Sequence, residues 1–555
     1  MQYRKLIALA LLVFPHIGPL WADQISRYAA ARDAELVVEL PNGKIRGKHN
    51  GAFYSYESIP YAQPPVGELR FESPLPYTVK WDGVRDVTQK PVPCMQWDQF
   101  KSGEGDDKLH GAEDCLTVNV YKPISTHNKT LPVLIFIHGG AFMFGSAKQY
   151  DEELIMRRQG FVVVKMNYRL GPLGFLSTED SVIPGNYGLK DQRLALQWIK
   201  SNIARFGGDP ERMVVVGFSA GGASVHLHMM QKDFKEYAKV AASFSGTAFS
   251  PWVVQSNSRS RAFKLANNLN CTDVSTSTEI KRCLKSKAAH EIVWGVRSFL
   301  VFGYNPFTTF GPVVEPVLVR DAFLTQTPEH IVRSDEFAEL PWLVSYTAQD
   351  GGYNAAELLQ ILPRRREMIE SLNERWFDVA PYALFFKDAM TTVEELDDHS
   401  MALKNDYLYN KNFSVESYRD VQRMYTDVLF KEGVEKAVRL HRKFSKSPIY
   451  AYVYDNPQSE SVAAILAKRS DIHFGTTHGD DLYLIFRNPS GLPTLSEKLE
   501  IMSNNFIKML EDFVSKSYEL KFGDCKFMDN VNQENLQLLR IMQDKCENLS
   551  VNEFP

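Results

Sequence analysis

One stretch decides the fold of this chain: Met213-Val214-Val215-Val216-Gly217-Phe218-Ser219-Ala220-Gly221-Gly222. A methionine and three valines are typical of a buried strand, and the residues that follow, 223–230, favour a helix. Between them stands a G-x-S-x-G pattern, whose glycines relieve backbone crowding on both sides of the serine. The stretch predicts a sharp strand-to-helix turn that exposes a nucleophilic Ser219 and points the Ala220 N–H at a developing oxyanion. The competing interpretation is a glycine-rich turn with an incidental serine.

Apolar runs indicate the other strands of a sheet. Residues 132–137 and 161–166 are almost continuously apolar, which is typical of strands that helices cover on both faces. Further candidates are 241–245, 340–346 and 449–454. Apolar residues spaced by threes and fours across 495–513 indicate a helix. Strands that alternate with helices predict an α/β protein with a mostly parallel central sheet and helices on both faces.

Two further features complete this outline. Residues 36–48 predict a hairpin, because Asn42-Gly43 supplies the positive φ angles of a tight turn, and we expect this antiparallel edge to begin the sheet. The stretches 255–335 and 355–445 are longer than ordinary connections. We expect both to be helical insertions that roof the site rather than independent domains.

Composition and charge indicate a large folded core and argue against a nucleic-acid-binding protein. The chain has 555 residues, 44% hydrophobic and 12% aromatic, so it can bury a large core. Its formal net charge is −4 with acids and bases interspersed, which argues against nucleic acid as a partner. Because no break in composition divides the chain, residues 23–555 are expected to form a single domain.

Residues 1–22 have the pattern of a secretory signal peptide. Arg4 and Lys5 precede an apolar run at 6–14, and Ala22 is a small residue suited to cleavage. No later stretch reaches the ~20 apolar residues of a membrane span, and residues 550–555 do not resemble the hydrophobic tail of a lipid-anchor signal. We expect the mature protein to be secreted and extracellular, without a membrane anchor.

The cysteines suit an oxidising compartment, where an even number is usually paired. Six cysteines can pair in many ways, and proximity along the chain favours three local pairs: Cys94 with Cys115, Cys271 with Cys283, and Cys525 with Cys546. A metal site is not expected, because there is no C-x-x-C and no histidine pair at i, i+4 near them. Sequons for surface glycosylation occur at Asn128, Asn270, Asn412 and Asn548.

Three loops offer partners for the serine. The run 132–137 ends in His138-Gly139-Gly140-Ala141-Phe142, whose small residues would let a substrate carbonyl approach backbone N–H groups. The alternative is an ordinary turn at the end of a strand. An acid and then a histidine should follow the serine at strand ends, and Asp350 and His478 fit this order. Asp480 and Asp481 lie closer to His478 in sequence, but residues of the same loop would have to fold back to reach it.

Several motifs, taken in order, resemble the type-B carboxylesterase and cholinesterase family over essentially the whole mature chain. They are residues 113–120, 138–142, 186–192 and 206–210, the turn at Ser219, and His478-Gly479. Through residues 54–62 and 350–356 the chain is most similar to the secreted β-esterases of flies. The resemblance implies an α/β-hydrolase fold and the same three local disulfides.

The resemblance also implies the roles of the site residues. Ser219, Asp350 and His478 would be the catalytic triad, and the N–H groups of Gly140, Ala141 and Ala220 would form the oxyanion hole. The chain departs from the family twice. The family acid is more often glutamate, and Ala141 replaces a common third glycine, which should preserve its N–H while narrowing the space beside it.

The sequence is therefore interpreted as a serine carboxylesterase that hydrolyses small-molecule esters through an acyl-enzyme, without a cofactor. A juvenile-hormone-type esterase is an alternative, although such enzymes usually carry glutamine next to the serine, where this chain has Phe218. A non-catalytic adhesion or binding protein on the same fold is a further alternative. Proteins of that kind lack the intact serine site.

Overall fold

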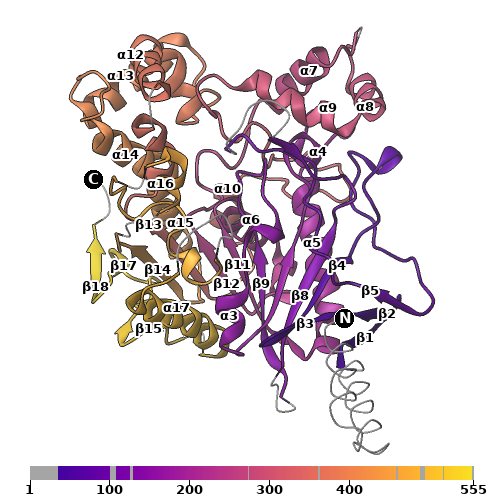
Figure 1. The fold of residues 1–555 in the computed structure, drawn as a ribbon. Coiled ribbons are helices and arrows are strands. Elements are labelled where there is room, and N and C mark those ends of the chain that lie inside the picture. Colours follow the sequence, from indigo (N-terminus) through magenta and orange to yellow (C-terminus); the bar gives the residue numbers. More distant parts are fainter. Residues whose placement is uncertain are drawn as a thin grey trace, which may run out of the picture.

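The computed structural model describes residues 35–100, 108–124, 129–272, 274–360, 363–457, 461–469, 471–487, 494–516 and 518–552. Its centre is an 11-stranded sheet (Figure 1). In spatial order the strands are β18 (Cys546–Val551), β17 (Leu536–Ile541), β14 (Ile449–Tyr454), β13 (Trp342–Thr347), β12 (Val240–Phe244), β11 (Gly208–Phe218), β9 (Leu131–Ile137), β10 (Val162–Met166), β8 (Thr117–Pro123), β4 (Phe53–Pro60) and β3 (Lys48–Asn50).

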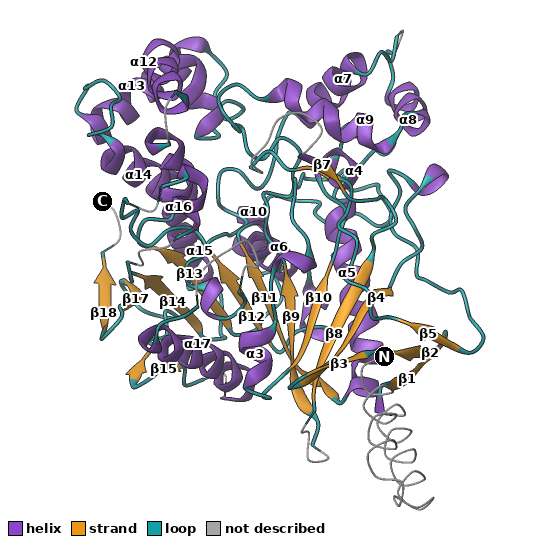
Figure 2. Ribbon diagram, in the orientation of Figure 1, coloured by secondary structure: helices purple, strands orange, loops and turns teal. Residues whose placement is uncertain are grey.

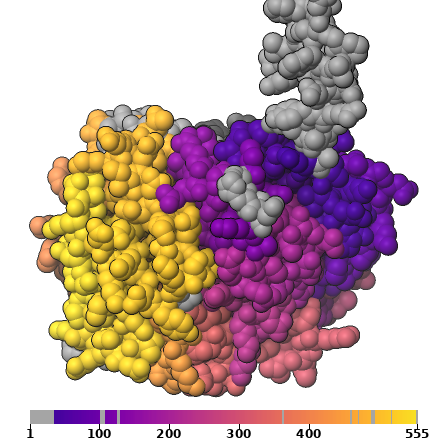
Figure 3. Space-filling model, turned by 90° about the horizontal axis from the view of Figure 1, so that it is seen from below, coloured from indigo at the N-terminus to yellow at the C-terminus, as the bar shows by residue number. Residues whose placement is uncertain are grey.

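The middle of this sheet is parallel, as the apolar runs predict. Neighbouring strands from β17 to β10 run parallel, whereas β18, β8, β4 and β3 are added antiparallel at the two edges. In a space-filling view from below, the C-terminal segments form one side of the molecule and the N-terminal segments the other (Figure 3). This division follows from β18 and β3 being the two edge strands.

The described helices are numbered in chain order. They are α3 (Glu153–Arg157), α4 (Gly171–Phe175), α5 (Tyr187–Asn202), α6 (Ala220–Met229), α7 (Ser258–Asn268), α8 (Ser277–Ser286), α9 (Ala289–Trp294), α10 (Pro328–Arg333), α11 (Gly352–Ala355), α12 (Arg364–Ala383), α13 (Val393–Leu408), α14 (Tyr418–Thr426), α15 (Glu432–His441), α16 (Val462–Ala467) and α17 (Glu497–Lys516).

Helices cover both faces of the sheet, which explains why its central strands lack polar alternation. Ile135 of β9 packs in the core that contains residues of α5 and α6. Its neighbour Phe136 packs in the opposite core, with Phe506 and Leu510 of α17. Side chains of one strand point alternately to the two faces, so both faces require apolar residues. The predicted α/β architecture with helices on both faces is confirmed.

The two long insertions are helical, as expected. They carry α7 to α10 and α12 to α15, and α7–α9 and α12–α14 stand above the carboxyl ends of the parallel strands (Figure 2). Active sites of open α/β sheets lie at these ends. The insertions are therefore placed over the predicted position of Ser219.

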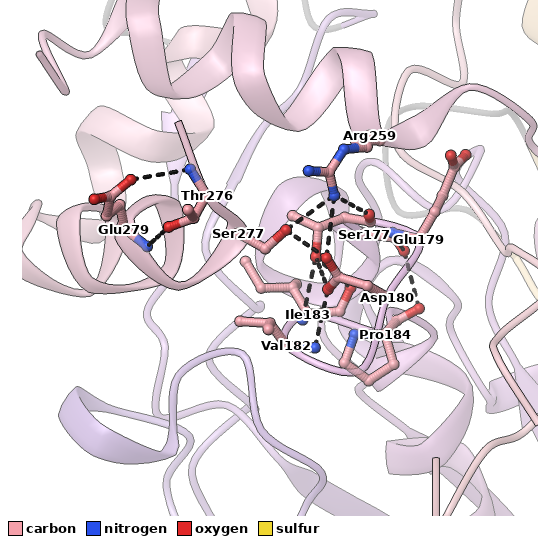
Figure 4. A network of polar contacts seen from close by, with 11 residues as sticks. Ser177, Glu179, Asp180, Val182, Ile183, Pro184, Arg259, Thr276, Ser277 and Glu279 are labelled. Carbon is pink, nitrogen blue, oxygen red and sulfur yellow. Dashed lines mark hydrogen bonds and ion pairs between the residues drawn. The ribbon is translucent and has the colours of Figure 1, made fainter. Parts of the chain in front are cut away.

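A polar network ties the first insertion to the loop between α4 and α5 (Figure 4). Oδ2 of Asp180 accepts hydrogen bonds from Ser277 Oγ at 2.5 Å and from Arg259 at 3.1 Å. Its Oδ1 accepts from Thr178 Oγ1 at 2.7 Å and from the N–H of Val182 at 3.0 Å. One carboxylate thus joins the start of α7, the start of α8 and its own loop.

The N-terminal hairpin corrects one expectation. Strands β1 (Val37–Leu40) and β2 (Gly43–Arg46) do pair antiparallel, but with β5 (Val84–Asp86) they form a separate three-stranded sheet. The reason is that β2 pairs parallel with β5, so no edge remains on it for β3. The turn also differs from the expectation, because only Gly43 has a positive φ, of 144°, and Asn42 does not.

Candidate active site

Ser219 occupies a strained turn between β11 and α6. Its φ of 57° and ψ of −121° are unusual for a residue other than glycine. A Cβ on Gly217 would lie 2.0 Å from the carbonyl oxygen of Gly221, and a Cβ on Gly221 would lie 2.0 Å from that of Ile137. Both glycines of the motif are therefore required by contact between backbones. The sharp strand-to-helix turn predicted from the sequence is present.

Asp350 and His478 meet although 128 residues separate them in sequence. Asp350 follows β13 and is fully buried, and its Oδ1 lies 2.5 Å from Nδ1 of His478. Its Oδ2 accepts hydrogen bonds from Ser245 Oγ and from the N–H of Thr347, each at 2.8 Å. A carboxylate can only accept, so Nδ1 carries the imidazole proton and Nε2 retains its lone pair.

The two other aspartates near the histidine in sequence bond elsewhere. Oδ2 of Asp480 accepts from the N–H of Thr477 at 2.7 Å, and Oδ2 of Asp481 accepts from the hydroxyl of Tyr452 at 2.8 Å. Burial raises the pKa of Asp480 well above its usual value and raises the pKa of Asp481 to about 6. Of the three aspartates, Asp350 is the one placed to orient His478.

Aromatic rings enclose the imidazole of His478. The ring centroids of Phe218 and Phe430 lie 4.6 Å and 4.7 Å from that of His478, and Tyr353 lies at 5.7 Å. Only 8% of His478 is exposed. The rings restrict the imidazole to an orientation that keeps its contact with Asp350.

A cavity of about 450 Å³ opens at this place, lined by both Ser219 and His478. Most of its wall is apolar, and its aromatic residues include Phe100, Phe144, Phe218, Trp252, Phe307, Tyr353 and Phe430. Phe307 comes from the first helical insertion and Phe430 from the second. Both insertions thus contribute to the roof of the cavity, and its walls favour apolar ester groups.

The glycine-rich loop after β9 lines the same cavity through Gly139, Gly140 and Ala141. Gly140 has a φ of 113°, and a Cβ there would lie 1.9 Å from the carbonyl oxygen of Phe144. Ala141 has a φ of 54°, a left-handed conformation that glycine adopts at lower cost. Among the described residues, no turn or loop hydrogen bond uses the N–H of Gly140, Ala141 or Ala220. These donors remain available to an oxyanion.

The cysteine and sequon predictions have different outcomes. The three local disulfides are formed, joining Cys94 to Cys115, Cys271 to Cys283 and Cys525 to Cys546. Asn270, Asn412 and Asn548 are exposed, as a glycosylated asparagine must be. Asn128 and the predicted signal peptide, 1–22, lie outside the described residues.

Within the part of the chain that the structure describes, no group of three or more His, Cys, Asp or Glu side chains is arranged to hold a metal ion. None of the helices described there is long and apolar enough to cross a membrane.

Sequence reasoning missed the groups that hold the acid and the base. Ser245 and Thr347 fix the carboxylate of Asp350, and Phe430 packs on His478. The one available signal for Ser245 and Thr347 was their position at the ends of predicted strands. Phe430 lies inside a long helical insertion, where nothing local indicates a contact with the site.

This sheet, with its serine turn and helical roof, is that of an α/β-hydrolase. Juvenile hormone esterase from Manduca sexta, solved with OTFP covalently attached, superimposes with a TM-score of 0.76 over 93% of this chain and 96% of that one, at 24% sequence identity. At this identity the likeness shows the fold alone.

Sequence comparison identifies the family. The model of the carboxylesterase family matches residues 34–554. Esterase-5B of Drosophila miranda is 55% identical over 541 residues, which are 97% of this chain and 98% of that protein. Esterase-5A of Drosophila pseudoobscura pseudoobscura is 55% identical over 522 residues, 94% of this chain and 95% of that protein. The chain belongs to the carboxylesterase family and is a carboxylic ester hydrolase, similar to esterases of flies.

Proposed function

We propose that the protein is a secreted serine carboxylesterase that works through a Ser219–His478–Asp350 triad and an acyl-enzyme. The observation that carries this proposal is the contact between Asp350 and His478 at a cavity that Ser219 also lines. A serine on a strained turn, a histidine oriented through Nδ1 and free N–H groups are the parts that acyl transfer needs.

The first half of the reaction acylates the enzyme. Nε2 of His478 accepts the proton of Ser219 while Oγ bonds to the ester carbonyl carbon, and the carbonyl oxygen becomes an oxyanion. The N–H groups of Gly140, Ala141 and Ala220 stabilise this charge. As the tetrahedral intermediate collapses, the carbon–oxygen bond to the alcohol breaks and the imidazolium protonates the departing alcohol.

The second half restores the enzyme. His478 takes a proton from water, whose oxygen attacks the acyl carbon and forms a second tetrahedral intermediate. The bond to Ser219 then breaks, its oxygen regains a proton from the imidazolium, and the carboxylic acid is released. Asp350 stays ionised in each step and stabilises the imidazolium.

Secretion belongs to the same proposal. Three disulfides suit an oxidising compartment, and residues 1–22 have the pattern of a signal peptide. The exposed sequons at Asn270, Asn412 and Asn548 are accessible to glycosylation.

Covalent trapping tests the nucleophile. An activated serine attacks phosphorus as it attacks a carbonyl carbon, so diethyl p-nitrophenyl phosphate should leave one diethylphosphoryl group on the peptide that contains Ser219, as found by mass spectrometry. Folded Ser219→Ala protein should carry none. If wild-type protein is active on esters but the phosphoryl group is found on a different serine, the proposed site is wrong.

A further inference from the structure

A second cavity, of about 440 Å³, lies outside the catalytic one. Its walls come from residues 251–264, 299–309 and 381–389. The first two segments include the start of α7 and part of the same insertion, and the third includes the end of α12, so both helical insertions contribute to the walls. The two insertions stand above the sheet (Figure 1). No step of the proposed reaction uses this cavity.

The charged side chains of this second cavity favour an anion. Arg261, Lys264 and Lys387 line it, against a single carboxylate, that of Asp388. Arg261 is already paired with Asp388 at 2.8 Å. Lys264 and Lys387 have no carboxylate partner among the described residues. Two positive charges are therefore left for a ligand.

The remainder of the wall suits a hydrocarbon chain. Val254, Phe299, Val301 and Phe385 supply apolar surface, and Lys264 Nζ lies 4.7 Å from the ring centroid of Phe299, so charge and apolar surface adjoin.

A thin aromatic wall separates the two cavities. The ring of Phe385, which lines the second cavity, lies 4.6 Å from the ring of Phe307, which lines the catalytic cavity. Phe385 has a φ of 60°, a rare conformation for a bulky residue and one that is found at ligand-binding positions. The strained backbone of Phe385 therefore lies in the wall between the catalytic cavity and the second cavity.

We propose that the second cavity is a non-catalytic binding site for an amphipathic monocarboxylic acid. The carboxylate lies near Lys264 and Lys387, and the aliphatic chain lies against Phe299 and Phe385. An acid of this class is also what hydrolysis of an apolar ester releases. Binding at the second cavity does not require that reaction.

Fluorescence titration with cis-parinaric acid, a conjugated fatty acid, tests the site on the full secreted chain. The double variant Lys264→Glu/Lys387→Glu should raise the Kd at least roughly tenfold, because two attractive charges become repulsive. Lys235→Glu is the matched control, since Lys235 is an exposed lysine of the 3-10 helix Lys232–Glu236 and does not line the cavity. It should change the Kd less than twofold.

Two further measurements locate the ligand and separate charge from packing. Ile465→Trp narrows the catalytic cavity, which Ile465 lines, and should leave the Kd unchanged. The uncharged parinaryl alcohol should bind the wild type and the double variant equally. Equal acid binding by wild type and double variant would overturn the proposal, as would loss of binding in Ile465→Trp alone. Thermal melting monitors folding, so the test does not depend on ester hydrolysis.

Discussion

Asp350→Asn is expected to abolish most of the activity while leaving the chain folded and secreted. The substitution preserves the size of the side chain and removes its negative charge. Ser245 Oγ and the N–H of Thr347 both donate to Oδ2, so the asparagine carbonyl oxygen will take that position. Its amide nitrogen then faces Nδ1 of His478, where Oδ1 now lies at 2.5 Å.

This orientation determines the size of the effect. An amide nitrogen donates, so Nδ1 must accept and the imidazole proton moves to Nε2, the atom that has to receive the proton of Ser219. The corresponding substitution in a serine protease lowers kcat ~10⁴-fold, or ~5 kcal/mol of transition-state stabilisation. We expect a loss of similar order here.

The assay is kcat/KM for p-nitrophenyl acetate, with circular dichroism to verify folding. Asp480→Asn and Asp481→Asn are the matched controls, because both carboxylates are buried in the same loop and bond to Thr477 and Tyr452 instead. Each should lose less than roughly tenfold. Near-normal turnover in Asp350→Asn, together with collapse in either control, would refute the assigned triad.

Two other outcomes follow from the same geometry. Burial raises the pKa of Asp481 in the folded protein from 3.8 to about 6. The folded state therefore binds this proton more tightly than the unfolded state, so the folded protein has extra stability below pH ~4 that is lost as pH rises through 6. The urea stability of Asp481→Asn relative to wild type should therefore increase by up to about 3 kcal/mol between pH 4 and pH 8, and a pH-independent difference would contradict the shift. Gly217→Ala should not accumulate as folded protein, because its Cβ would lie 2.0 Å from the carbonyl oxygen of Gly221; normal secretion of this variant would be inconsistent with so close a turn.

Much of the fold could be predicted because burial on two faces leaves a local signal. The run 132–137 lies within β9 and the run 449–454 is β14, since a strand covered by helices must be apolar at every position. The order of the strands leaves no such signal. In the sheet β9 lies between β11 and β10, an arrangement set by crossovers that pack whole helices. The N-terminal hairpin also shows that local signals do not give the order of strands. The pairing of β1 with β2 was predicted correctly, but their assignment to the large sheet was wrong.

The candidate site also has one part that a local stretch of sequence predicts, the serine turn, and one part that it does not, the acid. Ser219, Gly217 and Gly221 lie within five consecutive residues, so the demand of the Gly221 carbonyl for a glycine at 217 is a local one, whereas the demand for a glycine at 221 comes from the carbonyl of Ile137 on β9. The acid is different, because its assignment depends on which carboxylate reaches Nδ1 of His478 across 128 residues of sequence. Sequence proximity favours Asp480 and Asp481, yet their own loop and β14 supply the donors that hold them. Asp350 reaches the histidine because parallel neighbours β13 and β14 end at the same edge of the sheet, a relation that no single stretch of the chain contains.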